Sequence, residues 1–233
     1  MAELFPAEFP EGVFPNVHVY AFAPIDSRMY VLIPRETKHP EILVIDPQIN
    51  AESIAEIRRV SPRMVYIILT HEHYDHISGV NDFREHFGDR CRVICTASCA
   101  DRIRNPAKNL SRYFEALFCG HSEAIQNEVA ALNIQPYTCE ADLGFDREYT
   151  MSWDGPPLSM RSTPGHSPGS LCLFVGENVC FTGDTLLQTE TILRLPGSNR
   201  KLYMEQTLPW LQRLPAGTLI GPGHGEVFRI DPK

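Results

Sequence analysis

Three of the chain's nine histidines lie within six consecutive residues, His-Glu-His-Tyr-Asp-His at positions 71–76. Neutral imidazoles and carboxylates are good ligands for zinc and for other first-row divalent metals. A hydrophobic core would exclude such a cluster, because a buried charge is costly unless it is paired or binds a metal. His71 and His73 are two residues apart, so they face the same side of an extended segment and can share one ion.

The rest of this cluster points to a second ion. Asp75 and His76 lie one turn further along the chain and can reach it, whereas Glu72 is expected to point away. The helical zinc motif His-Glu-x-x-His does not match, since Asp75 occupies its fifth position and the segment directly follows an apolar run typical of a strand.

Three further candidate ligands lie in turns rich in glycine and proline: His166 in STPGHSPGS, Asp184 in CFTGDT and His224 in GPGHG. Glycine allows a sharp turn and a close approach of the backbone to a metal. Two four- to five-coordinate ions would be filled if Asp184 and a hydroxide bridged them. The full predicted ligand set is His71, His73, Asp75, His76, His166, Asp184 and His224.

The elements that must position these residues are short strands separated by helices. Runs rich in β-branched and aromatic residues predict strands over 17–23, 29–34, 41–46, 64–70, 92–96, 158–162, 171–175, 178–183 and 218–223. Apolar spacing predicts helices over 51–60, 77–87, 109–118, 122–133 and 203–214. No linker divides the chain, so residues 1–233 are predicted to form one domain of two packed sheets with helices outside.

Composition narrows the possible partners. The formal net charge is −8 and no Lys/Arg run exceeds a pair, which argues against a nucleic-acid partner. No apolar run reaches the length of a membrane-spanning helix, so no membrane partner is expected. The N-terminal segment lacks the pattern of a signal peptide, and the seven cysteines form no Cys-x-x-Cys pair. We therefore expect reduced, mostly buried thiols and a cytoplasmic location.

The order of these motifs resembles the metallo-beta-lactamase superfamily. The resemblance runs from VIDP (44–47) through THEHYDHISG (70–79), TPGHSPGS (163–170) and FTGDT (181–185) to GPGHG (221–225). It implies an αββα sandwich of two mixed β-sheets flanked by helices. It also implies ligand roles: His71, His73 and His166 for a first metal, Asp75, His76 and His224 for a second, Asp184 bridging, and Asp46 supporting the ligands from behind.

Individual residues and spacings indicate which branch of the superfamily the sequence resembles. Asp184 disfavours a true beta-lactamase, and His73 disfavours the flavodiiron branch. Only 39 residues separate Asp184 from His224, which leaves no room for the inserted domain of the oligonucleotide-processing branch. What remains resembles glyoxalase II, or hydroxyacylglutathione hydrolase, and related single-domain hydrolases, which share the segment KNLS at 108–111.

The thiol carrier stays open. Nine residues follow His224, so the C-terminal helical domain of glyoxalase II is expected to be missing, and the segment 186–203 departs from its glutathione-side motif. Coenzyme A, a carrier protein or a small thiol suits the sequence as well. The predicted substrate is a small-molecule or carrier-linked acyl thioester, and the oligomeric state is not determined by the sequence.

The resemblance and the ligand chemistry together predict a hydrolase with two divalent metal ions. Metal binding lowers the pKa of a bound water toward ~7, the resulting hydroxide attacks the carbonyl, and an ion stabilises the oxyanion. Asp75 would both bind a metal and orient the hydroxide, which makes it the catalytic candidate. Zinc is the expected metal, with iron and manganese open. A lactonase, a phosphodiesterase, a beta-lactamase and a non-catalytic metal-binding protein remain alternatives.

Candidates for the substrate groove are Tyr113, Phe114, Phe118, Arg194, Arg200, Lys201 and Tyr203. The three cations could receive a phosphate or carboxylate of the substrate. The alternatives are a solvated charged loop for the cations and an amphipathic packing helix for the aromatic residues. The other four histidines match no motif and are expected at the surface or in the core: His18, His39, His86 and His121.

Overall fold

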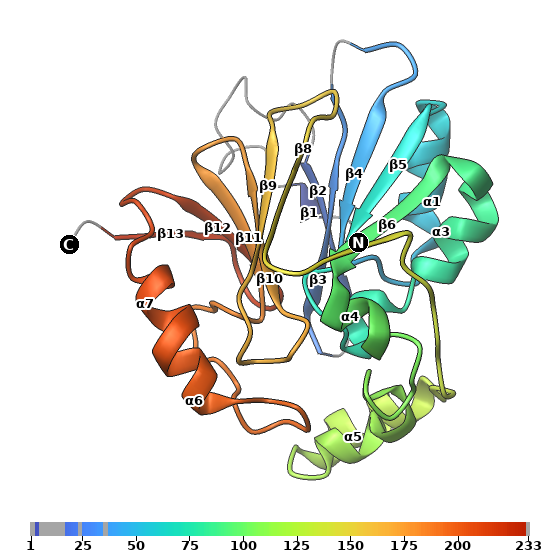
Figure 1. Cartoon of the computed structure of the whole chain (residues 1–233). Helices are drawn as coiled ribbons and strands as arrows, with labels where there is room; N and C mark the ends of the chain where they lie inside the picture. The colour runs from blue at the N-terminus through green and yellow to red at the C-terminus, as the bar shows by residue number, and fades with distance from the viewer. Residues whose placement is uncertain (1–2, 5–16, 23–24, 35–36, 232–233) are drawn as a thin grey trace.

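Two β-sheets pack face to face with helices on both outer sides, as the ribbon of this computed structural model shows (Figure 1). The structure describes residues 3–4, 17–22, 25–34 and 37–231. The predicted αββα sandwich is confirmed. Two sequence predictions involve residues outside this described part. They are the absence of a signal peptide, which concerns the N-terminal segment, and the last residue of the predicted strand 17–23.

The first sheet contains seven strands among the described residues, in spatial order β1 to β7. They are β1 (Glu3–Leu4), β2 (Val17–Phe22), β3 (Ser27–Leu32), β4 (Glu41–Ile45), β5 (Met64–Ile68), β6 (Cys91–Thr96) and β7 (Leu143–Phe145). Strands β1 to β4 pair antiparallel, and β4 to β7 pair parallel. Parallel pairing needs crossover connections, and helices supply them on the outer face.

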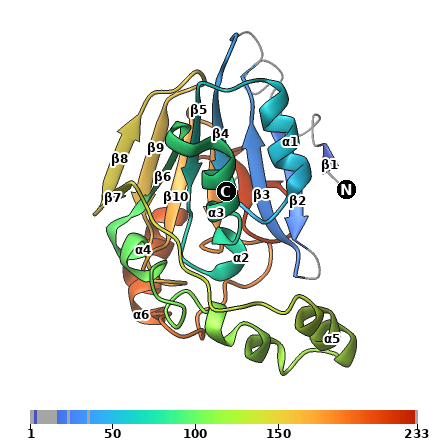
Figure 2. The same ribbon diagram turned by 90° about the vertical axis from the view of Figure 1, so that its right-hand side faces the viewer.

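The helices that cover the first sheet are α1 (Ala51–Arg59), α2 (Tyr74–Ile77), α3 (Val80–Phe87), the short η1 (Gly88–Arg90) and α4 (Ala97–Arg102). Figure 2 shows α1, α2 and α3 in front of this sheet. Helix α1 begins where the Asn50 side chain accepts a hydrogen bond from the Ser53 amide, at 2.8 Å. Its Ile54 and Ile57 are buried against the sheet, in line with the predicted amphipathic pattern.

The second sheet contains six strands in the described part of the chain, in the order β13-β12-β11-β10-β9-β8. They are β8 (Glu148–Met151), β9 (Leu158–Ser162), β10 (Leu171–Val175), β11 (Val179–Gly183), β12 (Leu219–Pro222) and β13 (Phe228–Arg229). Only β11 and β12 pair parallel within this sheet as described. Their crossover contains α6 (Arg200–Leu202), the π-helical η4 (Tyr203–Thr207) and α7 (Leu208–Leu211) on the outer face.

The main core lies between the two sheets. Ile45 and Ile68 of the first sheet meet Leu173 and Phe181 of the second, and all four are buried. The rings of Tyr30 and Phe181 lie 4.8 Å apart across this interface. Each such side chain stabilises the fold by about 1.5–3 kcal/mol when it leaves water. The core therefore fixes the two sheets relative to each other, and with them the loops at their edges.

The predicted helix over 109–118 is wrong. Two short 3-10 helices stand there, η2 (Ser111–Tyr113) and η3 (Glu115–Phe118). The cause is local: Leu110 adopts the left-handed conformation with φ 67°, and the buried Asn109 side chain accepts a hydrogen bond from the Ser111 amide at 3.0 Å. Such side-chain bonds to the backbone compete with helix hydrogen bonds.

Other boundaries differ in smaller ways. The predicted helix 77–87 is divided into α2 and α3 at Gly79, where the backbone passes so close to Gln48 that a Cβ would lie 2.3 Å from its carbonyl oxygen. The predicted helix 203–214 begins earlier, contains a π-helical turn and ends at Leu211. The predicted helix 122–133 is confirmed as α5 (Glu123–Ala131), capped by Ser122.

The segment between α4 and α5 lies beyond the carboxyl ends of β4, β5 and β6, at the bottom of Figure 1. It is held by a small apolar cluster of its own, in which Phe114 and Val129 are buried against Tyr74 of α2. The rings of Tyr74 and Phe114 are 5.3 Å apart. Among the described residues, no helix has the length and apolar character needed to cross a membrane.

Candidate metal centre

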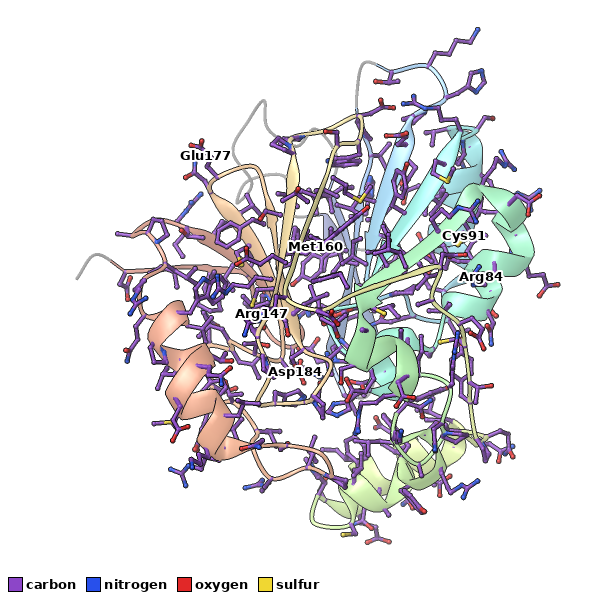
Figure 3. The ribbon with its side chains drawn as sticks, in the orientation of Figure 1. Arg84, Cys91, Arg147, Met160, Glu177 and Asp184 are labelled. Atoms are coloured by element: carbon purple, nitrogen blue, oxygen red, sulfur yellow. The ribbon has the colours of Figure 1, made fainter. Side chains whose placement is uncertain are left out.

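The predicted ligands come from loops that meet at one edge of the sandwich. The segment 71–76 follows β5, Asp184 directly follows β11, and His224 follows β12. His166 lies in the turn between β9 and β10. Figure 3 shows Asp184 at this edge, between the sheets and the helices below them. Carboxyl ends of parallel strands share one edge of a sheet, which is why residues far apart in the sequence converge here.

The first trio of predicted ligands is His71, His73 and His166, all buried. Nδ1 of His73 lies 3.1 Å from Nε2 of His71 and 3.1 Å from Nε2 of His166. The three nitrogens all lie within 4.8 Å of one another, which is the spacing that a single ion can bridge. A three-histidine set of this kind leaves a further coordination position open for water or substrate.

The second ligand trio is Asp75, His76 and His224. Oδ2 of Asp75 lies 3.2 Å from Nε2 of His76 and 3.4 Å from Nε2 of His224. The two Nε2 atoms are 3.3 Å apart. This trio therefore also converges on one point, with mixed nitrogen and oxygen donors that suit zinc, iron or manganese.

Asp184 lies between the two trios. Its Oδ2 is 3.4 Å from Nε2 of His166 and 3.4 Å from Nε2 of His224, and its Oδ1 is 3.6 Å from Nε2 of His76. One carboxylate thus reaches a member of each trio. Its Oδ1 is buried without a hydrogen-bond partner among the described residues, a state that calls for a bound partner.

Four of the five histidines form a hydrogen bond through Nδ1, the ring nitrogen that points away from the centre. Their Nε2, which faces the centre, is then free to accept. The outer partners are the Thr70 hydroxyl for His71 (3.1 Å), Asp46 for His76 (3.1 Å), the Ile192 carbonyl for His166 (2.8 Å) and the Ile25 carbonyl for His224 (3.0 Å). Such outer bonds orient metal-binding histidines and fix which nitrogen carries the proton. Nitrogen and oxygen lone pairs that face one another repel unless a cation lies between them. The donor set therefore suits two metal ions.

Asp46, which directly follows β4, contacts Thr70 and the predicted ligand His76. Its Oδ1 accepts the Thr70 amide at 2.7 Å, and its Oδ2 accepts the Thr70 hydroxyl at 2.6 Å and faces Nδ1 of His76. Burial raises the pKa of Asp46, although His76 and Thr70 oppose the shift. The residue sits behind the ligands, in the supporting place that its motif implies.

Glu72 points away from the centre, as expected. Its carboxylate is fully buried and pairs with Nε of Arg102 from α4. It also accepts the Ser167 hydroxyl at 2.8 Å and the Gly169 amide at 3.1 Å. Glu72 therefore ties the loop of His71 and His73 to the turn that carries His166.

The electrostatics differ between the two trios. Burial holds the pKa of His71 well below its usual value and lowers that of His73 to about 3. Burial also opposes protonation of His76 and His224, but the carboxylates of Asp75 and Asp184 outweigh it and raise the pKa of His76, and that of His224 to about 10. Metal ions bind neutral imidazole, so binding at the second trio must release protons.

A cavity of about 280 Å³ opens directly onto the centre. Four predicted ligands form its floor: His73, Asp75, Asp184 and His224. Its walls are mostly apolar and consist of Ile25, Leu110, Phe114, Leu117, Phe118, Leu187, Ile192 and Leu195, with His121, Thr189 and Glu190. A second hollow of about 440 Å³ shares Thr189, Glu190 and Ile192 and adds Thr191, Leu193, Arg194 and Arg200. Concave, largely apolar sites with a few polar groups are typical of ligand pockets.

The predicted substrate residues fall into two groups. Phe114 and Phe118 line the cavity, and Arg194 and Arg200 line the second hollow. Three others lie outside both linings: Tyr113 is exposed, Lys201 is exposed with its amine 3.9 Å from Glu205, and Tyr203 is buried.

Tyr203 has a structural position instead of a place in the groove. Its hydroxyl donates to the Thr185 carbonyl at 3.1 Å, and its ring packs where a Cβ on Gly165 would lie. It supports the turn beside His166.

Sequence reasoning missed several residues of the cavity. His121 is exposed, in line with the expected surface position, but it also lines the cavity, and its ring lies 5.2 Å from that of Phe118. Leu187 and Leu195 lie in an irregular segment that carries no periodic signal, and Leu110 lies in the segment 109–118, where the predicted helix was wrong. Their place beside the centre follows from the three-dimensional structure, in which the segment 110–121 and the loop after β11 line the same cavity.

Comparisons with known proteins agree with this geometry. Residues 41–224 match the family model described as the metallo-beta-lactamase superfamily. A probable metallo-hydrolase of Streptococcus pyogenes serotype M6 is 31% identical over 188 residues, which cover 79% of this chain and 74% of that protein.

Two further proteins are similar at lower identity. A hydroxyacylglutathione hydrolase of Cereibacter sphaeroides is 29% identical over 202 residues, 86% of this chain but 64% of that protein, so the chain spans less than two thirds of it. Among solved structures, the B3 metallo-beta-lactamase BLEG-1 superposes with a TM-score of 0.70 at 28% identity, covering 91% of this chain and 92% of that one.

Proposed function

The chain belongs to the metallo-beta-lactamase superfamily, and on that premise we propose that it is a metal-dependent hydrolase of acyl thioesters. The observation that carries the proposal is the convergence of seven side chains, with Asp184 reaching both trios, beside an apolar cavity whose floor four of them form. The similarity to a hydroxyacylglutathione hydrolase supports thioesters as the substrate class.

In this proposal the first trio would hold one ion and the second trio another, and Asp184 could contribute a carboxylate oxygen to the same centre. Two divalent ions bound there would polarise a carbonyl group and lower the pKa of water toward ~7. Zinc is the proposed metal, and iron or manganese suits the same donors.

The chain's own residues bind and orient the reactants. Asp75 stands at the cavity floor with its pKa held low, because His76 and His224 outweigh the effect of burial, so its carboxylate can accept a hydrogen bond from the attacking water. A substrate bound between the mostly apolar walls would displace water from the centre, which would strengthen the electrostatic contacts there.

The reaction balances without an additional general acid from the protein. The oxygen of water bonds to the acyl carbon, the carbon–sulfur bond breaks, and sulfur leaves with the electron pair as a thiolate. A thiol has a pKa near ~8.5, so its anion is a good leaving group at neutral pH. The products are a carboxylate and a thiol, with one proton released.

The likeness to BLEG-1 favours one second candidate, hydrolysis of a beta-lactam amide at the same centre. A lactone or a phosphodiester would use the same residues. These substrates differ from thioesters in the leaving group, so one panel of assays separates them.

The experiment is thiol release after reconstitution with zinc, iron(II) or manganese, using thioesters of coenzyme A, glutathione and N-acetylcysteamine. A chromogenic beta-lactam, a lactone and bis-(4-nitrophenyl) phosphate run in parallel. Thioester turnover well above the other classes is expected. Turnover of the beta-lactam alone would replace the proposal with the second candidate.

Variants test the site itself. His71→Ala and Asp184→Ala should each lose metal and thiol release. Asp101→Ala is the matched control, because Asp101 of α4 is an exposed carboxylate that pairs with Lys108 away from the centre. Full activity in either site variant would contradict the ligand assignment.

A further inference from the structure

The lining of the cavity has a distinct charge pattern. Among its described residues there is no lysine or arginine, and Glu190 is the charged side chain apart from the predicted ligands and His121. Eight apolar side chains and Thr189 form the rest. An anionic part of a substrate would therefore meet no lysine or arginine side chain inside this cavity.

One wall is held in place from the interior. Asn109 is fully buried and donates to the Tyr137 carbonyl at 2.8 Å, which fixes the start of the segment 110–118. Leu110 then takes its left-handed conformation, and Phe114 packs on Tyr74. The apolar wall is thus a built surface beside the metal centre.

The opposite wall is tied to the first trio. The Ile192 carbonyl accepts the hydrogen bond of His166, so this loop is fixed relative to the centre. The Ile192 side chain is nevertheless 42% exposed, a large apolar group facing the cavity. Exposed apolar surface at a concave site marks the place of an apolar ligand group.

The second hollow differs from the cavity in having two cationic side chains besides the shared Glu190. Arg194 and Arg200 line it, both are exposed, and within the described part of the chain neither forms an ion pair with a carboxylate. It shares Thr189, Glu190 and Ile192 with the cavity, so the two spaces adjoin. Guanidinium groups bind phosphate and carboxylate with fixed geometry.

We propose that the acyl group of the substrate is apolar and uncharged and lies in the cavity, while the thiol carrier bears an anionic group that lies against Arg194 and Arg200. This inference rests on the proposed thioesterase function and adds the direction in which the substrate binds. The reacting carbonyl then stands at the cavity floor, and the sulfur leaves toward the second hollow. An acyl group with a carboxylate is disfavoured because in the cavity it would face Glu190 without the two arginines that line the second hollow.

The acyl part is tested with coenzyme A thioesters of acetate, butyrate, hexanoate, lactate and succinate. From acetyl to butyryl, kcat/KM should rise about fourfold per methylene, the ratio that corresponds to ~0.8 kcal/mol for each buried CH₂. Lactoyl should fall below butyryl, and succinyl should be lowest. Equal rates for all acyl groups, or a preference for lactoyl or succinyl, would overturn this part.

Variants of the cavity wall make the test specific. Ile192→Ala should lower kcat/KM for hexanoyl about tenfold and for acetyl much less, because part of a buried apolar contact is lost. Leu132→Ala removes an exposed leucine outside the cavity and should change neither. Binding of the non-hydrolysable thioether S-hexyl-coenzyme A, measured by calorimetry, should weaken in parallel in Ile192→Ala. Unchanged binding would contradict the assignment.

The carrier part is tested with the double variant Arg194→Gln/Arg200→Gln. Its KM for hexanoyl-coenzyme A should rise roughly threefold to tenfold, as expected for partly exposed charge pairs. Its KM for the uncharged N-acetylcysteamine thioester should stay the same. Arg213→Gln, another exposed arginine outside both hollows, is the control. An equal effect on both carriers, or none on either, would overturn the role of the two arginines.

The outcomes separate this inference from the function on which it rests. If no thioester of any carrier is hydrolysed by metal-loaded protein, the proposed function fails. If thioesters are hydrolysed but the acyl and carrier series are flat, the function stands and the binding direction is wrong.

Discussion

Removing Arg102 should destabilise the protein and weaken metal binding, although the residue touches no predicted ligand. Glu72 lies between His71 and His73 and is 0% exposed at its side chain, while Arg102 is 16% exposed. Replacing Arg102 with methionine keeps most of the packing but leaves a buried carboxylate without its cation. Breaking a buried pair in this way costs about 3–5 kcal/mol of unfolding free energy.

A second substitution separates charge from packing. Glu72→Gln in the Arg102→Met background removes the unpaired charge and keeps an oxygen that can accept from Ser167 and Gly169. One amide donor is then left without a partner, at a cost of about 1–3 kcal/mol. The double variant should therefore recover roughly 2 kcal/mol relative to Arg102→Met alone.

The assay is urea unfolding of the metal-free variants, followed by zinc competition against a chelator. Arg102→Met should also weaken zinc binding at the first trio about 10–100-fold, because Glu72 holds the turn of His166 through Ser167 and Gly169. The control is Arg104→Met, whose partner Glu140 is exposed and whose own side chain is 57% exposed, with an expected cost below about 1 kcal/mol. If Arg102→Met costs no more than this control, or if Glu72→Gln gives no rescue, the reasoning is refuted.

Three further predictions concern the centre and the wall of the cavity. Gly223→Ala places a Cβ 2.1 Å from Oδ1 of Asp184, so it should displace that carboxylate and abolish thiol release. Gly120→Ala, with open space around the new Cβ, should leave activity unchanged. An active Gly223→Ala enzyme would refute the bridging position of Asp184. Asn109→Ala removes hydrogen bonds to the Ile103 and Tyr137 carbonyls and from the Ser111 amide. It should lower the free energy of unfolding by about 1–3 kcal/mol, measured by urea unfolding. In steady-state kinetics it should raise KM more than it lowers kcat. On acidification, protons should displace metal from the second trio first, because His76 and His224 have raised pKa values, whereas His71 and His73 in the first trio have lowered ones. Metal content after dialysis at about pH 5.5 should be close to one ion per chain, and simultaneous loss of both ions would contradict this order.

The convergence of these side chains was predictable because their residue types are chemically restricted. Seven histidine and aspartate side chains at strand ends and glycine-rich turns have few explanations other than metal binding. The strands that carry them are buried apolar runs, so β5, β10 and β11 were predicted within two residues of their ends. The αββα sandwich followed from the order of these runs and from the resemblance to the family.

Other parts depend on contacts that leave no local signal. Arg102 lies 30 residues beyond Glu72 in an ordinary helix, and nothing in its neighbourhood marks it as the partner of a buried carboxylate. The strands β7 and β8 are short and partly exposed, so they were missed. The helix predicted over 109–118 failed because Asn109 bonds to the backbone of the next turn, which overrides apolar periodicity.

The most direct test of the central claim is a titration of metal-free protein with zinc, with thiol release from hexanoyl-coenzyme A measured at each addition. Two ligand trios joined by Asp184 predict activity that rises with added zinc and reaches its plateau at two ions per chain. Full thiol release without metal, or a plateau at less than one ion per chain, would contradict the claim that these residues form a two-metal hydrolytic centre.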